Sequence, residues 1–238
     1  MQTSNFSIPI NEMLQMQATL NDATNGPGWR SGVTQLGKLI NWQRCIYMEA
    51  AELIDSYPWK HWKSIDAKVD EENARVELVD IWHFLLSLVL EKLSSDQALA
   101  LLDKALQAND AQQTELNGQM NVMSQVAVHE VMLKTALESA GEMGSDSAAY
   151  LTRLADSFFS ACKVADLDFD QLYKIYMAKN VLNKFRQDNG YKEGTYIKEW
   201  NGVEDNVVMF EIMRELKVFY GHELYELLDE QYKKHGFS

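Results

Sequence analysis

Residues 71–93 read EENARVELVDIWHFLLSLVLEKL. The apolar positions predict one helix from about Glu71 to Leu93. The second half of this run is apolar nearly all round, which is typical of a helix buried in a core or in a subunit interface. Only three prolines and 12 glycines occur in the whole chain, so long uninterrupted helices are expected around it. The stretch therefore predicts a helical protein with a buried central helix.

Helical spacing recurs on both sides of this run, and nothing resembles regular short strands separated by turns. The segment 25–28, NGPG, breaks the first predicted helix, and Pro58 ends the second. The predicted fold class is all-α, a multi-helix bundle forming a single domain over 1–238, with 109–147 as a variable, insertion-like segment. Further helices are expected at about 11–22, 38–56, 95–108, 131–139, 148–165, 167–185 and 207–234, and loops at 109–128 and 187–206.

The chain of 238 residues has a net charge of −13, from 35 acidic and 22 basic side chains. An acidic surface repels phosphate backbones, so binding to nucleic acid or to an anionic membrane is not expected. Cys45 and Cys162 stand alone, which fits a reducing compartment better than a disulfide framework. The N-terminus does not resemble a signal peptide, and the apolar stretch from Ile81 to Leu90 is about half a membrane span. A cytoplasmic protein is expected.

Two pairs of carboxylates have the spacing that places them on one face of a helix. Glu49 and Glu52 are three residues apart, and Glu77 and Asp80 repeat the spacing on the next long helix. Three helical steps leave two side chains about 60° apart around the axis. If the helices pair antiparallel, all four carboxylates converge. The alternative is that each pair is an ordinary solvated face.

Converging like charges are costly unless cations neutralise them. Oxygen ligands without histidine or cysteine favour hard ions, so Mg²⁺ is expected, with Mn²⁺ as a possible substitute. Such ions would let an acidic protein bind a polyanionic small molecule.

The segment from Lys179 to Lys198 reverses the global charge balance, with five basic and two acidic residues. Arginine suits bidentate contacts to phosphate, and lysine adds point charges. A basic surface loop explains the composition equally well. His83, on an apolar helix, fits a core histidine better than a catalyst. Trp59 and Trp62 fit core positions better than base-stacking ones.

Longer strings resemble a known family. Glu49-x-x-Glu52, 24 intervening residues and Glu77-x-x-Asp80 resemble the metal signature of the all-α nucleoside triphosphate pyrophosphohydrolases, which include the MazG-type enzymes. The fuller strings resemble the dimeric dUTPases of bacteria, phages and trypanosomatids. They are EAAELIDS at 49–56, WKHWK at 59–63, ELVDIWHF at 77–84, NVLNKFRQDNGY at 180–191, GTYIKEWNG at 194–202, and MLQMQ with LND near the N-terminus. The resemblance covers about residues 11–90 and 168–236.

The resemblance implies a homodimer that converts dUTP to dUMP and pyrophosphate, and in many relatives also hydrolyses dUDP. By position, Glu49, Glu52, Glu77 and Asp80 would be the catalytic residues and the ligands of two or more Mg²⁺ ions. The residues expected around the phosphates are Lys179, Arg186, Tyr191, Lys192 and Lys198. Those expected around the deoxyuridine are Gln17, Asn21, Trp62, Phe84 and Asn183.

The expected chemistry is metal-assisted phosphoryl transfer, with Glu52 as the candidate that orients or deprotonates the attacking water, and Glu49 as its rival. An amide such as Asn183 can donate to one uracil group and accept from another, a pattern that cytosine inverts. Attack at the α- or the β-phosphorus, the strictness for uracil, and the number of ions stay open. The alternatives are a phage-type dCTP/dUTP hydrolase, a broader nucleotide pyrophosphohydrolase, and a non-catalytic helical interaction protein.

Overall fold

A computed structural model describes residues 6–63, 66–111, 120–138, 147–216, 221–234 and 236. The chain divides into two compact units, unit 1 (Met1–Tyr173) and unit 2 (Lys174–Ser238). Within the described residues there are nine α-helices and one small sheet, so the predicted all-α class is confirmed. A single catalytic domain over residues 1–238 stays a prediction.

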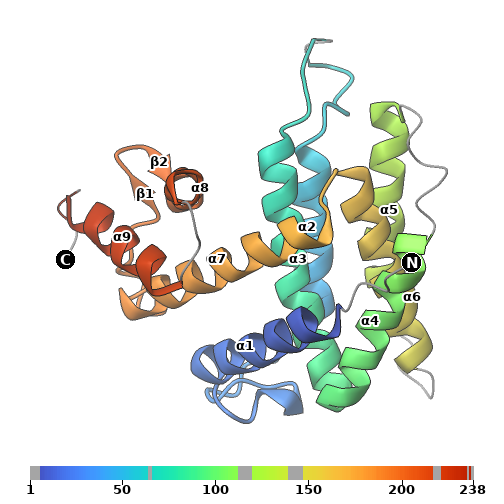
Figure 1. Ribbon diagram of the computed structural model, residues 1–238, viewed down its shortest axis with the longest axis horizontal. Coiled ribbons are helices and arrows are strands. Elements are labelled where there is room, and N and C mark those ends of the chain that lie inside the picture. The colour runs from blue at the N-terminus through green and yellow to red at the C-terminus, as the bar shows by residue number, and fades with distance from the viewer. Residues whose placement is uncertain are drawn as a thin grey trace. The chain divides into compact units, whose positions relative to one another are not determined.

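Unit 1 is built around two helices joined by a link of irregular chain. The helices α2 (Trp42–Asp55) and α3 (Glu71–Lys92) run antiparallel and side by side (Figure 1). Helix α1 (Ser7–Asn25) packs on α3 and α4, at the end of the α2–α3 pair opposite the link (Figure 1). The other elements of unit 1 are η1 (Trp29–Ser31), α4 (Ser95–Ala111), α5 (Val122–Glu138), α6 (Ser147–Val164) and the start of α7 (Phe169–Asp188).

Helix α3 is the centre of the unit 1 core, as its sequence predicts. Asp70 caps it by accepting from the Asn73 backbone N–H at 3.0 Å, and acidic residues occupy its first turn, where the helix dipole favours them. Trp82 is fully buried and stacks on Phe158 with ring centroids 5.1 Å apart. The apolar second half is therefore buried inside unit 1. The sequence predicts burial in a core or in a subunit interface, and the structure shows burial in the core of unit 1.

Helix α2 begins four residues later than the sequence suggests. Asn41 accepts from the Arg44 backbone N–H at 2.8 Å and so caps the helix. Before it, Thr34 and Lys38 exchange a turn hydrogen bond, and Gly37 adopts a left-handed φ of 74°. Periodicity alone continued through residues 38–41 because Leu39 and Ile40 fit the apolar stripe by chance.

Helix α5 corrects one prediction. Residues 122–128, expected to belong to a loop, are the first part of this helix, while residues 112–119 and 139–146 lie outside the described residues. The helix packs on α2 and α6, and it buries Val126, His129, Met132 and Ala136. Its polar exposed positions weaken the periodic signal that would have marked its start.

Unit 2 has an aromatic core around Phe185, which lies on the second part of α7. The Phe185 ring lies 5.3 Å from Tyr225 and 5.5 Å from Tyr232, measured between ring centroids. The segment 187–206, which the sequence predicts to be a loop, contains a short hairpin. In it β1 (Glu199–Trp200) pairs antiparallel with β2 (Val203–Glu204). Asn201 and Gly202 turn this hairpin with φ of 53° and 80°. The remaining elements are α8 (Asp205–Glu215) and α9 (Gly221–Lys234).

Among the helices of the described residues, none combines the length and the apolar character that crossing a membrane requires.

Candidate active site

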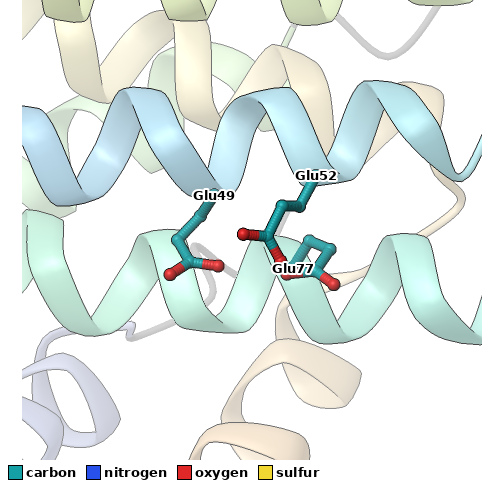
Figure 2. Close-up of side chains that lie close together, drawn as sticks. All are labelled: Glu49, Glu52 and Glu77. Carbon is teal, nitrogen blue, oxygen red and sulfur yellow. The ribbon is translucent and has the colours of Figure 1, made fainter.

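The acidic residues of α2 and α3 meet between the two helices. Glu49 and Glu52 extend from α2 towards α3, where Glu77 lies beside Glu52 (Figure 2). One carboxylate oxygen from each of the three residues lies within 4.8 Å of the other two. Glu77 is buried, Glu49 is half-buried and Glu52 is exposed, so the cluster opens to solvent on the side of Glu52.

The apolar face of α2, which is buried, determines where the carboxylates of this helix lie. On α2, Ile46, Ala50 and Leu53 are fully buried, which leaves Glu49 and Glu52 on the flank that faces α3. The ends of the link are also fixed. The Asp70 backbone N–H donates to the Ser56 carbonyl at 2.9 Å, and the Asn73 amide donates to the Ser56 hydroxyl at 2.8 Å. The register of the two helices near Glu52 and Glu77 is thus held by hydrogen bonds.

The electrostatics of the cluster are those of crowded like charges. Burial, and after it the nearby carboxylates of Asp80, Glu77 and Glu52, together raise the pKa of Glu49 to about 8. Asp80 is not among the three residues with oxygens within 4.8 Å, but it is close enough to act on Glu49. The structure therefore brings three of the four predicted carboxylates together and leaves Asp80 beside them.

This set of donors fits a hard divalent cation. Carboxylate oxygens are the ligands that Mg²⁺ prefers, and no histidine or cysteine joins the cluster within the described residues. A cation would offset the burial and the repulsion that together hold Glu49 protonated. Glu49, Glu52 and Glu77 can hold it directly, with Asp80 adjacent.

Two residues predicted to contact the base lie in a buried polar network between α1 and α3. The side chains of Gln17 and Asn21 are each 3% exposed. The Gln17 amide donates to Asn21 Oδ1 at 3.1 Å, and both amides donate to the Ser87 hydroxyl, at 3.1 and 3.0 Å. His83 Nδ1 contacts Gln17 Oε1 at 2.7 Å. Ser87 and His83 were not predicted as functional residues, because a buried serine on an apolar helix gives no sequence signal.

Phe84 is half-buried on α3, and its ring belongs to a row of three aromatic side chains. It stacks on Trp42 at 6.2 Å, and Trp42 meets Trp29 edge-on at 6.0 Å. Trp62 is 62% exposed, and its ring contacts are with Trp59 and His61 of the link. The link lies at the end of the α2–α3 pair opposite α1 (Figure 1), so Trp62 is not gathered with Gln17 and Asn21.

The basic segment of unit 2 forms a polar cluster around Arg186. Arg186 makes a bidentate ion pair with fully buried Asp205, through Nε at 2.8 Å and Nη2 at 2.7 Å. Asn183 Oδ1 accepts from Arg186 Nη1 at 3.2 Å, and Lys179, only 1% exposed, donates to Asn206 at 3.0 Å. The Tyr196 hydroxyl donates to Asp205 at 2.8 Å, and burial together with Asp205 raises the Tyr196 pKa.

Three predicted residues thus converge in unit 2, namely Lys179, Asn183 and Arg186. Tyr191, Lys192 and Lys198 lie exposed on the following segment, where Lys198 approaches Glu204 at 3.6 Å. Asp205 and Asn206 were missed, because an acidic residue and an amide after a glycine turn look like ordinary surface positions.

A helical fold that gathers carboxylates between two antiparallel helices defines a class of protein, an all-α hydrolase with an acidic site suited to divalent metal. Residues 9–191 match a family model described as dUTPase, and the chain therefore belongs to the all-α dimeric dUTPase family. Its activity is that of a dUTP diphosphatase. A comparison with curated proteins found no match. The matched range contains the whole acidic cluster and ends before Asp205.

Proposed function

We propose that this chain hydrolyses dUTP to dUMP and pyrophosphate with Mg²⁺ held by Glu49, Glu52, Glu77 and Asp80. The observation that carries the metal assignment is the approach of three carboxylate oxygens to within 4.8 Å of one another. Mg²⁺ characteristically binds through a few carboxylates together with substrate phosphates. When bound, such an ion neutralises phosphate oxygens and acidifies water, which is the chemistry that pyrophosphate cleavage needs.

The carboxylates have different tasks in this proposal. Glu77 and Glu49, the more buried members, fix the position of the ion, because their side chains are held between α2 and α3. Glu52 is exposed and is the candidate that orients or accepts a proton from the attacking water. Water adds to the α- or the β-phosphorus, its proton passes to the accepting carboxylate, and the bond from that phosphorus to the oxygen that bridges the two breaks, so that dUMP and pyrophosphate separate. The same chemistry applied to dUDP would release phosphate and dUMP.

The residues on α3 succeed one another in an order that suits a nucleotide. Glu77, Asp80, Phe84 and Ser87 fall within about 80° of one another around the helix axis. From Glu77 to Ser87 the axis rises about 15 Å, comparable to the length of an extended nucleoside triphosphate. On α2, Trp42 precedes Glu49 by seven residues. On the antiparallel α3, Phe84 follows Glu77 by seven residues, and Trp42 and Phe84 stack on each other. We assign the phosphates to the acidic end and the base to the Phe84 end.

We assign the deoxyuridine to Gln17, Asn21, Phe84 and Asn183, without Trp62, which lies on the link at the opposite end of the α2–α3 pair (Figure 1). We assign the phosphates to Lys179, Arg186, Tyr191, Lys192 and Lys198. The bidentate pairing of Arg186 with Asp205 supports a fixed guanidinium, and fixed cations stabilise developing negative charge without reorganising. A dimer is part of the proposal through family membership, and light scattering tests it. A reducing compartment, the cytoplasm, suits the two free cysteines.

Pyrophosphate release from dUTP, dCTP, dTTP and UTP, each with Mg²⁺ and with chelator, tests the proposed function. Release confined to dUTP and abolished by chelator is expected, with phosphate release from dUDP measured in parallel. Release that persists in chelator would contradict the metal assignment, and equal release from all four nucleotides would contradict the base assignment.

A further inference from the structure

In the buried network between α1 and α3, the donor and acceptor roles of the Ser87 hydroxyl are fixed by its neighbours. The Ser87 hydroxyl donates to the His83 carbonyl at 2.8 Å, one turn earlier on α3. Its oxygen then acts as an acceptor, and the amides of Gln17 and Asn21 both donate to it. The reverse contact, from Ser87 to Asn21 Oδ1, is longer, at 3.4 Å. Ser87 is fully buried, so no water competes for these bonds.

This arrangement fixes which way both amides point. An amide oxygen cannot donate, so the two groups that face the accepting Ser87 oxygen are the NH₂ groups of Gln17 and Asn21. The Gln17 oxygen then faces His83, whose Nδ1 must carry the proton. Asn21 keeps one N–H and one oxygen lone pair beyond the hydrogen bonds it makes within the described residues.

Turning both amides over would preserve the Gln17–Asn21 and Gln17–His83 contacts described above and would lose those to Ser87. Gln17 would donate to His83 Nδ1, because neutral histidine can move its proton to Nε2. Asn21 would donate to the Gln17 oxygen. Two amide oxygens would then face Ser87, whose single hydroxyl proton can serve only one of them. Ser87 is therefore the residue that makes one orientation of the network more stable than the other.

We propose that Ser87 determines the preference for uracil over cytosine by locking the Asn21 amide. The inference rests on the proposed base site, in which Asn21 contacts the pyrimidine edge. Uracil presents a carbonyl oxygen and an N3–H, whereas cytosine presents an amino group and a bare N3, so the two bases require opposite amide orientations. With the ring position fixed by Phe84, an Asn21 amide held in one orientation can hydrogen-bond to uracil. Against cytosine in the same position, its N–H would face the amino group and its oxygen would face the unprotonated N3. Ser87 is a positioning residue and does not itself contact substrate.

Ser87→Ala tests this, with kcat/KM measured for dUTP and dCTP. Losing the deciding hydrogen bond should lower the ratio of dUTP to dCTP efficiency by about tenfold, through a rise in dCTP hydrolysis. Ser87→Thr keeps the hydroxyl and should keep the wild-type ratio. If Ser87→Ala does not fold, Ser87→Cys preserves the volume with a weak acceptor and should also lower the ratio. Parallel loss of both activities, with an unchanged ratio, would overturn the inference.

Two further variants separate the inference from its basis. Cys162→Ala removes a buried sulfur from α6 that takes no part in the hydrogen bonds described for the network, and it should leave the ratio unchanged, which controls for loss of stability alone. Asn21→Ala should depress dUTP efficiency if Asn21 contacts the base. An effect of Asn21→Ala together with an unchanged ratio in Ser87→Ala would overturn the role of Ser87 and leave the base site standing. No effect of Asn21→Ala would overturn both.

Discussion

Glu49 lies where burial and the surrounding carboxylates act on its pKa in the same direction. Its pKa is raised from 4.5 to about 8 because burial and then Asp80, Glu77 and Glu52 disfavour the ionised form. In the metal-free protein this carboxyl is therefore mostly protonated at pH 7. The unfolded chain loses that proton from about pH 4.5 upward. The contribution of Glu49 to stability is full below pH 4.5 and declines as pH rises through 8.

Mg²⁺ should displace this proton. Binding at pH 7 should release about one proton, and the apparent affinity should increase as pH rises towards 8, because a protonated carboxyl is not a ligand. Calorimetry in two buffers of different ionisation enthalpy measures the release. Glu49→Gln should bind Mg²⁺ more weakly and without the pH-dependent component. Binding by the wild-type chain with no proton release at pH 7 would contradict the assignment.

The ion pair of Arg186 and Asp205 should be far more important to stability than the surface pairs. Asp205 is fully buried and the Arg186 side chain is 11% exposed, so Asp205→Asn leaves a buried guanidinium without its paired negative charge. The expected loss is about 3–5 kcal/mol in the free energy of unfolding. Asp229→Asn, which removes the i,i+4 partner of the exposed Lys233, should cost about 0.5 kcal/mol or less. Urea unfolding compares the two, and equal small losses would disprove the structural role of Asp205.

At the scale of elements, the contact of α5 with the α2 region contains an uncharged histidine. His129 is fully buried, its ring lies 4.9 Å from that of Tyr57, and neither ring nitrogen has a hydrogen-bond partner within the described residues. Burial lowers the pKa of His129 from 6.5 to about 4. Below pH 6.5 the unfolded chain binds a proton that the folded chain does not. Stability from this residue is therefore lost as pH falls from 6.5 towards 4.

His129→Leu should remove this pH dependence. Between pH 7.5 and pH 5 the wild-type protein should lose about 2 kcal/mol more than the variant in the free energy of unfolding. His61→Leu is the matched control, because His61 is exposed in the link, and it should behave like the wild type. Urea midpoints at the two pH values provide the measurement. Parallel pH curves for wild type and His129→Leu would show that His129 does not set this slope.

The elements that could be predicted from sequence are those with one-sided or complete burial. The bounds of α3 follow from its cap at Asp70 and its unbroken apolar half, and they match the prediction within a residue. The start of α5 and the hairpin at Glu199–Glu204 could not be predicted, because strand pairs of two residues and polar helical turns carry little periodicity. They form because of contacts with α2 and within unit 2.

At the scale of the molecule, the acidic cluster was predictable and its surroundings were not. The spacing of Glu49, Glu52, Glu77 and Asp80 specifies a shared face from local helical geometry alone. The partners that orient other site residues, such as Ser87 for Asn21 and Asp205 for Arg186, lie 66 and 19 residues away in sequence. Hydrogen bonds over such separations depend on tertiary packing, which no local pattern records.

The net charge of −13 opposes the binding of a polyanionic nucleotide, and in the proposed mechanism a bound cation offsets this repulsion. A triphosphate approaching this molecule meets like charge except near bound metal or the cluster around Arg186. Activity should therefore follow Mg²⁺ concentration steeply and vanish with chelator. The same charge disfavours nucleic acid as a partner.

Pyrophosphate release from dUTP by Glu77→Gln, compared with Glu72→Gln on the same helix, tests whether the acidic cluster is the catalytic metal site. Glu77 is buried in the cluster, whereas Glu72 is exposed in the first turn of α3. Glu77→Gln should lower kcat by at least about 100-fold, through loss of a metal ligand and its charge, while circular dichroism and Glu72→Gln activity remain as in the wild type. A folded Glu77→Gln variant with wild-type turnover would contradict the metal site and the mechanism built on it.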